Sequence, residues 1–206
     1  MENNKSLFSL SRLEAITDGI FAIIITILIL TISVPDGDNV SSSKDLNNAL
    51  LNTLPLIMNY IISFFLISTF WMSHILELKM LKNTNRHHIL LNFVYIFFVS
   101  LIPFTTSLLG DYAGYIVAEI IFHLNIFLVY IASIVQWYYA IHISKLKSDS
   151  ISNDMIKKEE AIQKFKLIVP LIALGLTFLI SEYSSWAYLS LPFGISLIKK
   201  AHRKKT

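Results

Sequence analysis

Six apolar stretches follow one another along the chain, and short polar segments separate them. They occupy residues 12–34, 50–73, 89–109, 113–143, 165–181 and 184–199. A helix needs about 20 mostly apolar residues to cross the hydrocarbon core of a bilayer. The first four stretches reach this length, the fifth is marginal and the sixth is short. We therefore predict six transmembrane helices in a single domain over residues 1–206, with a re-entrant hairpin as the alternative for the last pair.

The composition agrees with an all-α integral membrane protein. Of the 206 residues, 54% are hydrophobic and only 15% are charged, whereas a soluble domain carries about a quarter charged residues. A signal peptide with its core at Ile20–Ile32 is the competing interpretation of the first stretch. Glu14 and Asp18 precede that core, however, and no small-residue cleavage site follows it. Cysteine is absent from the sequence, which excludes disulfides, thiolate metal sites and cysteine nucleophiles.

The positive charges predict the orientation of the helices. If the six stretches are helices, every Lys and Arg except Lys44 falls at the termini or in the loops that share their side of the membrane. Because Lys and Arg accumulate in cytoplasmic loops, both termini are expected in the cytoplasm of a multi-pass cell-membrane protein. The same distribution explains the basic pI without nucleic acid as a partner. The C-terminal Lys and Arg residues are expected to contact anionic lipid headgroups.

Polar side chains of three predicted helices should lie at one depth near the cytoplasmic side. Arg12 and Asp18 lie at the start of the first helix, Trp71 and His74 at the end of the second, and Asn92 near the start of the third. Polar groups within a membrane are costly unless they are paired with one another. We interpret this layer as a structural clamp between helices, and a proton-binding site is the alternative.

The fourth predicted helix carries Glu119 and His123, which are four residues apart and share one face. A structural pair is the simpler interpretation. Together with Asp18, these residues could instead serve a proton-coupled secondary transporter. No Walker loop, Gly-x-Ser-x-Gly or His-Glu-x-x-His motif occurs, so we expect neither an enzyme nor a metal or cofactor site.

The segment "RLEAITD" resembles the Arg-x-x-x-Phe-Ser-Asp signature that opens the first helix of the transmembrane protein 175 potassium channels. Arg12 and Asp18 match this signature, whereas Ile16 replaces its Phe and Thr17 its Ser. Two further segments resemble the same family: "FWMSH", with Trp71 and His74 as its Trp-x-x-His, and the third apolar stretch, with Asn92. The resemblance implies that Thr17 joins the polar network.

This resemblance implies a homotetrameric cation channel that favours potassium, with monovalent cations as permeant ions. It also implies that the first helix of each subunit lines a central pore that lacks a carbonyl filter loop. Consistent with this, no Thr-Val-Gly-Tyr-Gly stretch occurs in the chain.

The family pattern places a constriction five residues after Asp18, at Ile23. Thr26, Ile27 and Leu30 continue the same helical stripe. Four copies of Ile23 would form an apolar ring that gates by dewetting. Periodicity alone does not select this stripe, because nearly every position from Phe21 to Leu30 is apolar.

Overall fold

The computed structural model describes residues 9–35, 37 and 40–203, and the regular secondary structure of this part is entirely helical. The main helices are α1 (Leu10–Leu28), α2 (Ser43–Asn52), α3 (Leu54–Lys79), α4 (Arg86–Ser100), α5 (Ile102–Asp111), α6 (Ile116–Tyr138), α7 (Asn153–Ile180) and α8 (Leu191–Arg203). The 3₁₀ segment η1 (Ile29–Thr31) extends α1, the π-helical η3 (Tyr139–Ile143) ends α6, and the 3₁₀ segment η4 (Ser181–Ser190) precedes α8. The charged residues outside the described part include Lys5, Asp36, Asp38, Lys204 and Lys205.

Within the described residues, five segments are long and apolar enough to cross a membrane. They are Leu10–Thr31, Ser43–Lys79, Arg86–Asp111, Ile116–Ile143 and Asn153–Ile180. The first five predicted helices therefore each correspond to one such segment. The prediction of an all-helical chain with several membrane-crossing helices is confirmed.

The sixth predicted helix, 184–199, is wrong as a single element. The structure divides it between η4 and the short α8, which begins at Leu191. Pro192 lies in the first turn of α8, where its missing N–H costs nothing because that group has no helical partner. The 13 residues of α8 reach about 20 Å at 1.5 Å per residue, which is short of a bilayer core.

The fifth predicted helix, 165–181, begins too late in the prediction. Helix α7 starts at Asn153, and its first turns are rich in charged residues. These turns still bury Ile156 and Ile162, so they form an amphipathic extension of the apolar part. By its sequence, the polar segment Ser144–Lys164 fits either a linker or a short amphipathic helix, and from Asn153 onward the structure shows the helix.

Two proline residues divide predicted helices without ending the span. A single non-helical residue, Thr53, separates α2 from α3, and Leu101 separates α4 from α5. Pro55 and Pro103 then occupy the first turn of the helix that follows. Proline cannot donate the backbone hydrogen bond of a helix interior, so the helix breaks just before it.

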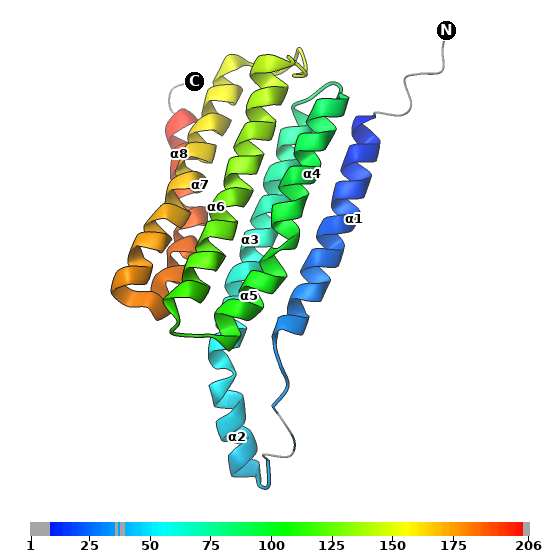
Figure 1. The fold of residues 1–206 in the computed structure, drawn as a ribbon. Helices are drawn as coiled ribbons and strands as arrows, with labels where there is room; N and C mark the ends of the chain where they lie inside the picture. Colours follow the sequence, from blue (N-terminus) through cyan, green and yellow to red (C-terminus); the bar gives the residue numbers. More distant parts are fainter. Residues whose placement is uncertain (1–8, 36, 38–39, 204–206) are drawn as a thin grey trace.

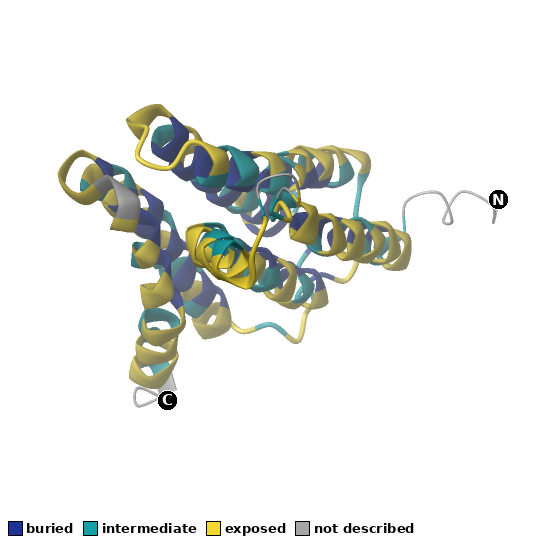
Figure 2. Cartoon of the chain, turned by 90° about the horizontal axis from the view of Figure 1, so that it is seen from below, coloured by how far each residue is buried: buried dark blue, intermediate teal, exposed yellow. Residues whose placement is uncertain are grey.

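The helices form a bundle in which α1 occupies one edge (Figure 1). Helix α1 packs against α3, α4 and α5, and α6 lies between α4 or α5 on one side and α7 on the other. Segment η4 and α8 pack against α7 at the opposite edge, whereas α2 extends below the bundle. Buried residues face the interior of the bundle and exposed residues face outward (Figure 2).

Helix α1 contacts the bundle through one stripe of its surface. The buried residues of this stripe are Leu13, Thr17, Phe21, Ile24 and Leu28, spaced three or four apart. The ring of Phe21 lies 6.2 Å from that of Tyr95 in α4. Lipid tails are as apolar as these side chains, so close packing and interhelical hydrogen bonds hold α1 in place. Because these contacts all use one stripe of α1, the opposite side of the helix remains uncovered in a single chain.

Candidate ion pathway and its polar ties

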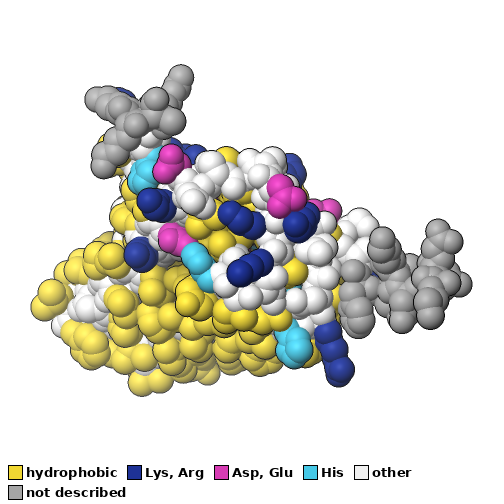
Figure 3. Space-filling view, turned by 90° about the horizontal axis from the view of Figure 1, so that it is seen from above, with side chains coloured by type: hydrophobic (Ala, Val, Ile, Leu, Met, Phe, Trp, Pro, Cys, Tyr) yellow, Lys and Arg dark blue, Asp and Glu magenta, His cyan; other side chains and the backbone are white. Residues whose placement is uncertain are grey.

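Most Lys and Arg side chains lie at the end of the bundle where α1 begins. We call this the basic end, and Figure 3 views it directly. The α3–α4 and α6–α7 connections meet there, and Lys82 of the first lies 3.3 Å from Asp149 of the second. Lys44, in α2, lies at the opposite end (Figure 1).

Asp18 of α1 is hydrogen-bonded to Trp71 of α3 near the basic end. The indole Nε1 of Trp71 donates a hydrogen bond to Asp18 Oδ1 over 2.8 Å. Both side chains are exposed in the single chain, with Trp71 at 36%. The bond therefore lies at the rim of the α1–α3 contact, on the side that a neighbouring subunit or lipid would cover.

A second hydrogen-bond network is buried and joins three helices, α1, α4 and α6. Asn92 of α4 donates to the hydroxyl of Thr17 over 3.0 Å and accepts from Gln136 of α6 over 3.1 Å. Gln136 Nε2 also lies 3.3 Å from His88 Nε2, and His88 Nδ1 lies 2.8 Å from the Thr84 hydroxyl. Thr17 and Asn92 have no exposed surface. Each polar group that is satisfied here would cost several kcal/mol if left unpaired in hydrocarbon.

The other two members of the predicted clamp lie differently. His74 is buried and stacks on the ring of Tyr95 at 5.3 Å, while its Nε2 has no hydrogen-bond partner among the described residues. Arg12 is exposed, and its backbone N–H donates to the Ser9 hydroxyl that caps α1. Its guanidinium makes no ion pair within the described part. The structure thus joins Asp18 to Trp71 and Thr17 to Asn92, but brings neither Arg12 nor His74 into hydrogen-bond contact with them.

The predicted pore stripe lies on the uncovered side of α1. Ile23, Ile27 and Leu30 are 57%, 46% and 76% exposed, and Thr26 is exposed with them. The Thr26 hydroxyl donates to the backbone oxygens of Ala22 and Ile23, so it adds little polarity to the stripe. A face that is this apolar and uncovered in one chain meets either lipid or other copies of the chain.

A buried polar cluster between α3, α6 and α7 was missed by the sequence reasoning. Glu77 Oε1 accepts from Gln163 over 3.0 Å and from Ser133 over 3.4 Å, and Lys166 donates to Ser73 over 2.7 Å. Lys166 was expected among the charges of the cytoplasmic loop, which is wrong because it lies within α7 and is only 5% exposed. Its position three residues after Gln163, on the buried face of an amphipathic helix, was the available signal.

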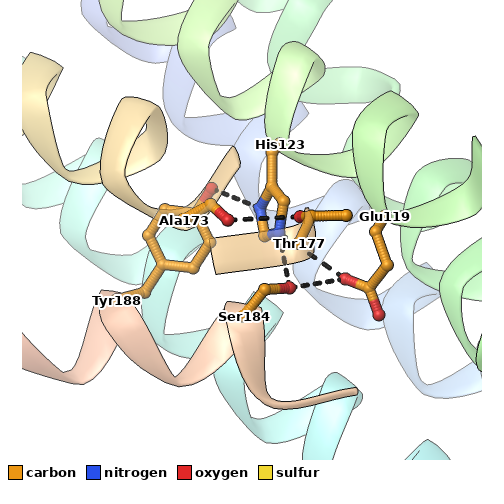
Figure 4. Close-up of polar contacts among 6 residues, drawn as sticks. All are labelled: Glu119, His123, Ala173, Thr177, Ser184 and Tyr188. Carbon is orange, nitrogen blue, oxygen red and sulfur yellow. Dashed lines mark hydrogen bonds and ion pairs between the residues drawn. The ribbon is translucent and has the colours of Figure 1, made fainter. Parts of the chain in front are cut away.

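Glu119 and His123, which the sequence predicts as a structural pair, lie 3.5 Å apart and form a network with two residues of η4 that the sequence did not indicate (Figure 4). His123 Nδ1 lies 2.9 Å from the Tyr188 hydroxyl, and its Nε2 lies 2.8 Å from the Ser184 hydroxyl. The Ser184 hydroxyl donates to Glu119 Oε2 over 2.8 Å. All four residues are buried. Helix α6 begins at the end of the bundle opposite the basic end, so this network and Asp18 lie far apart (Figure 1). No group of three or more His, Asp or Glu residues in the described part could hold a metal ion.

The sequence matches a known family in its first half. A family model described as the endosomal/lysosomal potassium channel TMEM175 matches residues 12–103. A potassium channel of Chryseobacterium sp. (strain P1-3) is 34% identical over 99 residues, which are 48% of this chain and 48% of that protein. A potassium channel of Streptomyces collinus is 35% identical over 101 residues, or 49% and 48% of the two chains. The aligned part thus spans about half the length of these curated relatives.

Solved structures extend the likeness to most of the chain. The crystal structure of a lysosomal potassium-selective channel TMEM175 homolog from Chamaesiphon minutus superposes with a TM-score of 0.76 and 26% identity. The superposition covers 91% of this chain and 96% of that one. A variant of the potassium channel MtTMEM175 shares the fold alone, with a TM-score of 0.58 and 18% identity. The resemblance predicted from Arg12, Asp18 and the later motifs is therefore confirmed.

Proposed function

We propose that this chain, which carries the sequence pattern and the fold of the TMEM175 family, is a potassium-favouring cation channel of the cell membrane. Its relatives are named as potassium channels, and one solved relative is named as potassium-selective. The observation that carries the proposal is the uncovered apolar face of α1, because Ile23, Ile27 and Leu30 are largely exposed in a single chain and can surround an ion pathway only together with other copies.

Four copies of the chain would cover this face by placing it around a central axis. Ile23, Thr26, Ile27 and Leu30 would then line the pore, and Ile23 would form its apolar constriction. Such a ring controls conduction by dewetting, since water and ions leave an apolar passage when it narrows. The packing of the buried stripe, together with the Asp18–Trp71 and Thr17–Asn92 hydrogen bonds, would hold α1 against its own subunit. The proposed channel uses no cofactor. Its partners are three further copies of the chain, membrane lipid and the permeant monovalent cations.

The charge distribution supports an orientation for the channel. Lys and Arg residues of the described part gather at the basic end, where α1 begins and α8 ends. Under the positive-inside rule this end faces the cytoplasm and brings both termini there. The proton-coupled transporter alternative receives no comparable support, since Asp18 and the Glu119–His123 pair lie in separate networks near opposite ends of the bundle.

Reconstitution into liposomes with a potassium gradient tests the proposal. We expect a passive current whose reversal potential lies nearer the potassium than the sodium equilibrium potential. Native mass spectrometry of the same preparation should report four copies per particle. Flux that requires a proton gradient would favour the transporter, and an inactive but folded tetramer would contradict the channel.

A further inference from the structure

A cavity of about 360 Å³ lies beside the buried Glu119 network, at the end of the bundle opposite the basic end. We call it the Glu119 pocket, and its walls come from the start of α3, the end of α5, the α5–α6 connection, α6 and η4. The lining residues used below are Met58, Asn59, Leu109, Glu119, Tyr183 and Trp186. None of these residues takes part in the proposed pore, so the pocket requires an explanation of its own.

The hydrogen bonds of the network can all be satisfied at once. The Ser184 hydroxyl donates to Glu119 Oε2, so its oxygen is free to accept from His123 Nε2. His123 Nδ1 lies 2.9 Å from the Tyr188 hydroxyl, which can donate to it or accept from it. Both ring nitrogens of His123 therefore have a partner within the network.

The network uses only one oxygen of the Glu119 carboxylate. Ser184 and His123 both approach Oε2, at 2.8 Å and 3.5 Å, and no Lys or Arg of the described part lies within ion-pair distance of Glu119. Glu119 is only 3% exposed, and a buried carboxylate in a membrane protein is stabilised by nearby positive charge. Figure 4 shows its second oxygen directed away from Ser184 and His123. Because Glu119 also lines the pocket, a cation bound in the pocket would contact this second oxygen.

The walls of the pocket indicate which cation fits. Met58 and Leu109 are apolar, and the rings of Tyr183 and Trp186 meet edge to face at 6.1 Å. Among these residues, Asn59 is the one besides Glu119 that offers a side-chain amide or carboxylate oxygen. A bare metal cation needs more oxygen ligands than this. An organic ammonium group needs one carboxylate, apolar surface for its carbon substituents and an aromatic face for cation–π attraction.

We propose that the Glu119 pocket binds a substituted ammonium group attached to an apolar body. The charged nitrogen lies against the free oxygen of Glu119, and its alkyl substituents contact Trp186, Tyr183 and Met58. This chemistry occurs both in the headgroups of ethanolamine and choline lipids and in free organic amines. The proposal does not depend on ion conduction, because the pocket and the pore stripe share no residue.

Calorimetric titration of the purified protein in a non-ionic detergent with hexyltrimethylammonium tests the site for a free amine. We expect saturable binding that Glu119→Gln weakens about tenfold or more, the effect of losing a charge-assisted contact. Glutamine keeps an acceptor for Ser184, so the network can persist. Asp111→Asn is the matched control, because Asp111 is exposed at the same end but borders a different cavity. The Asp111→Asn variant should bind the probe with the affinity of the wild type.

Two further measurements keep the proposal falsifiable if Glu119→Gln fails to fold. The uncharged isostere of the probe, with carbon in place of nitrogen, should not bind the wild type, and potassium chloride should not displace the probe by more than its ionic strength explains. Equal binding of the isostere, or specific displacement by potassium, would overturn the proposal.

Native mass spectrometry distinguishes the two sources. After release from nanodiscs of equal phosphatidylethanolamine and phosphatidylglycerol, retention of the ethanolamine lipid by the wild type and its loss in Glu119→Gln would identify a lipid headgroup. Binding of the soluble probe without such retention would identify a free amine. If neither binds, the proposal is wrong.

Discussion

At the scale of single residues, the bond between Asp18 and Trp71 is the feature of α1 that the family signature and the structure both single out. Removing either partner should weaken the α1–α3 contact. We expect Trp71→Phe and Asp18→Ala each to lower the free energy of unfolding by about 1.5–3 kcal/mol, the usual range for a hydrogen bond to a charged group. The double variant should lose less than the sum, because the two changes remove the same bond.

Chemical denaturation of the purified protein in detergent, with tetramer content followed by native mass spectrometry, measures this coupling. Thr69→Ala offers a control on α3, since its hydroxyl bonds only to the backbone of Phe65. Strictly additive losses for the pair, or normal stability with altered ion preference, would contradict a structural role for Asp18.

The exposed side chain of Ile23 leads to a second prediction at this scale. If four copies form an apolar constriction, Ile23→Asn introduces polar groups that hold water in it and raise the conductance several-fold. Single-channel recording in planar bilayers measures the change. Ile168→Asn is the control, because Ile168 is 51% exposed on α7, away from α1. Unchanged conductance in Ile23→Asn would place the constriction elsewhere.

At the scale of elements, α1 was predictable and α7 was not. The apolar run after Asp18 begins abruptly and ends in η1 before Pro35, so hydropathy alone locates it within a few residues. The first twelve residues of α7 carry enough charge to resemble a loop. Their two buried isoleucines, Ile156 and Ile162, are six residues apart with the buried Glu159 between them, so no continuous apolar stripe marks the buried face. The partners of Glu77 and Glu119 come from helices far away in sequence, and no local pattern specifies such contacts.

The lysines of α7 offer a prediction about this element. Lys164 is exposed, whereas Lys166 is 5% exposed and donates to Ser73. Acylation by a water-soluble amine reagent, followed by peptide mass spectrometry, should label Lys164 in the native protein and Lys166 only after unfolding. A reagent that reached both at equal rates would show that the start of α7 is a loop and not a helix packed on α3.

At the scale of the whole molecule, the bundle has one end rich in Lys and Arg and another with few positive charges, and the positive-inside rule translates this into an orientation. The absence of cysteine makes that orientation directly testable, because any introduced thiol is the only one in the chain. Lys44→Cys on α2 and Lys147→Cys in the α6–α7 connection place thiols at opposite ends. In intact cells, a membrane-impermeant maleimide should label Lys44→Cys alone and should reach Lys147→Cys only after permeabilisation. Labelling of Lys147→Cys alone would invert the topology, and with it the side from which ions reach Ile23 first, although the apolar face of α1 would still require a partner.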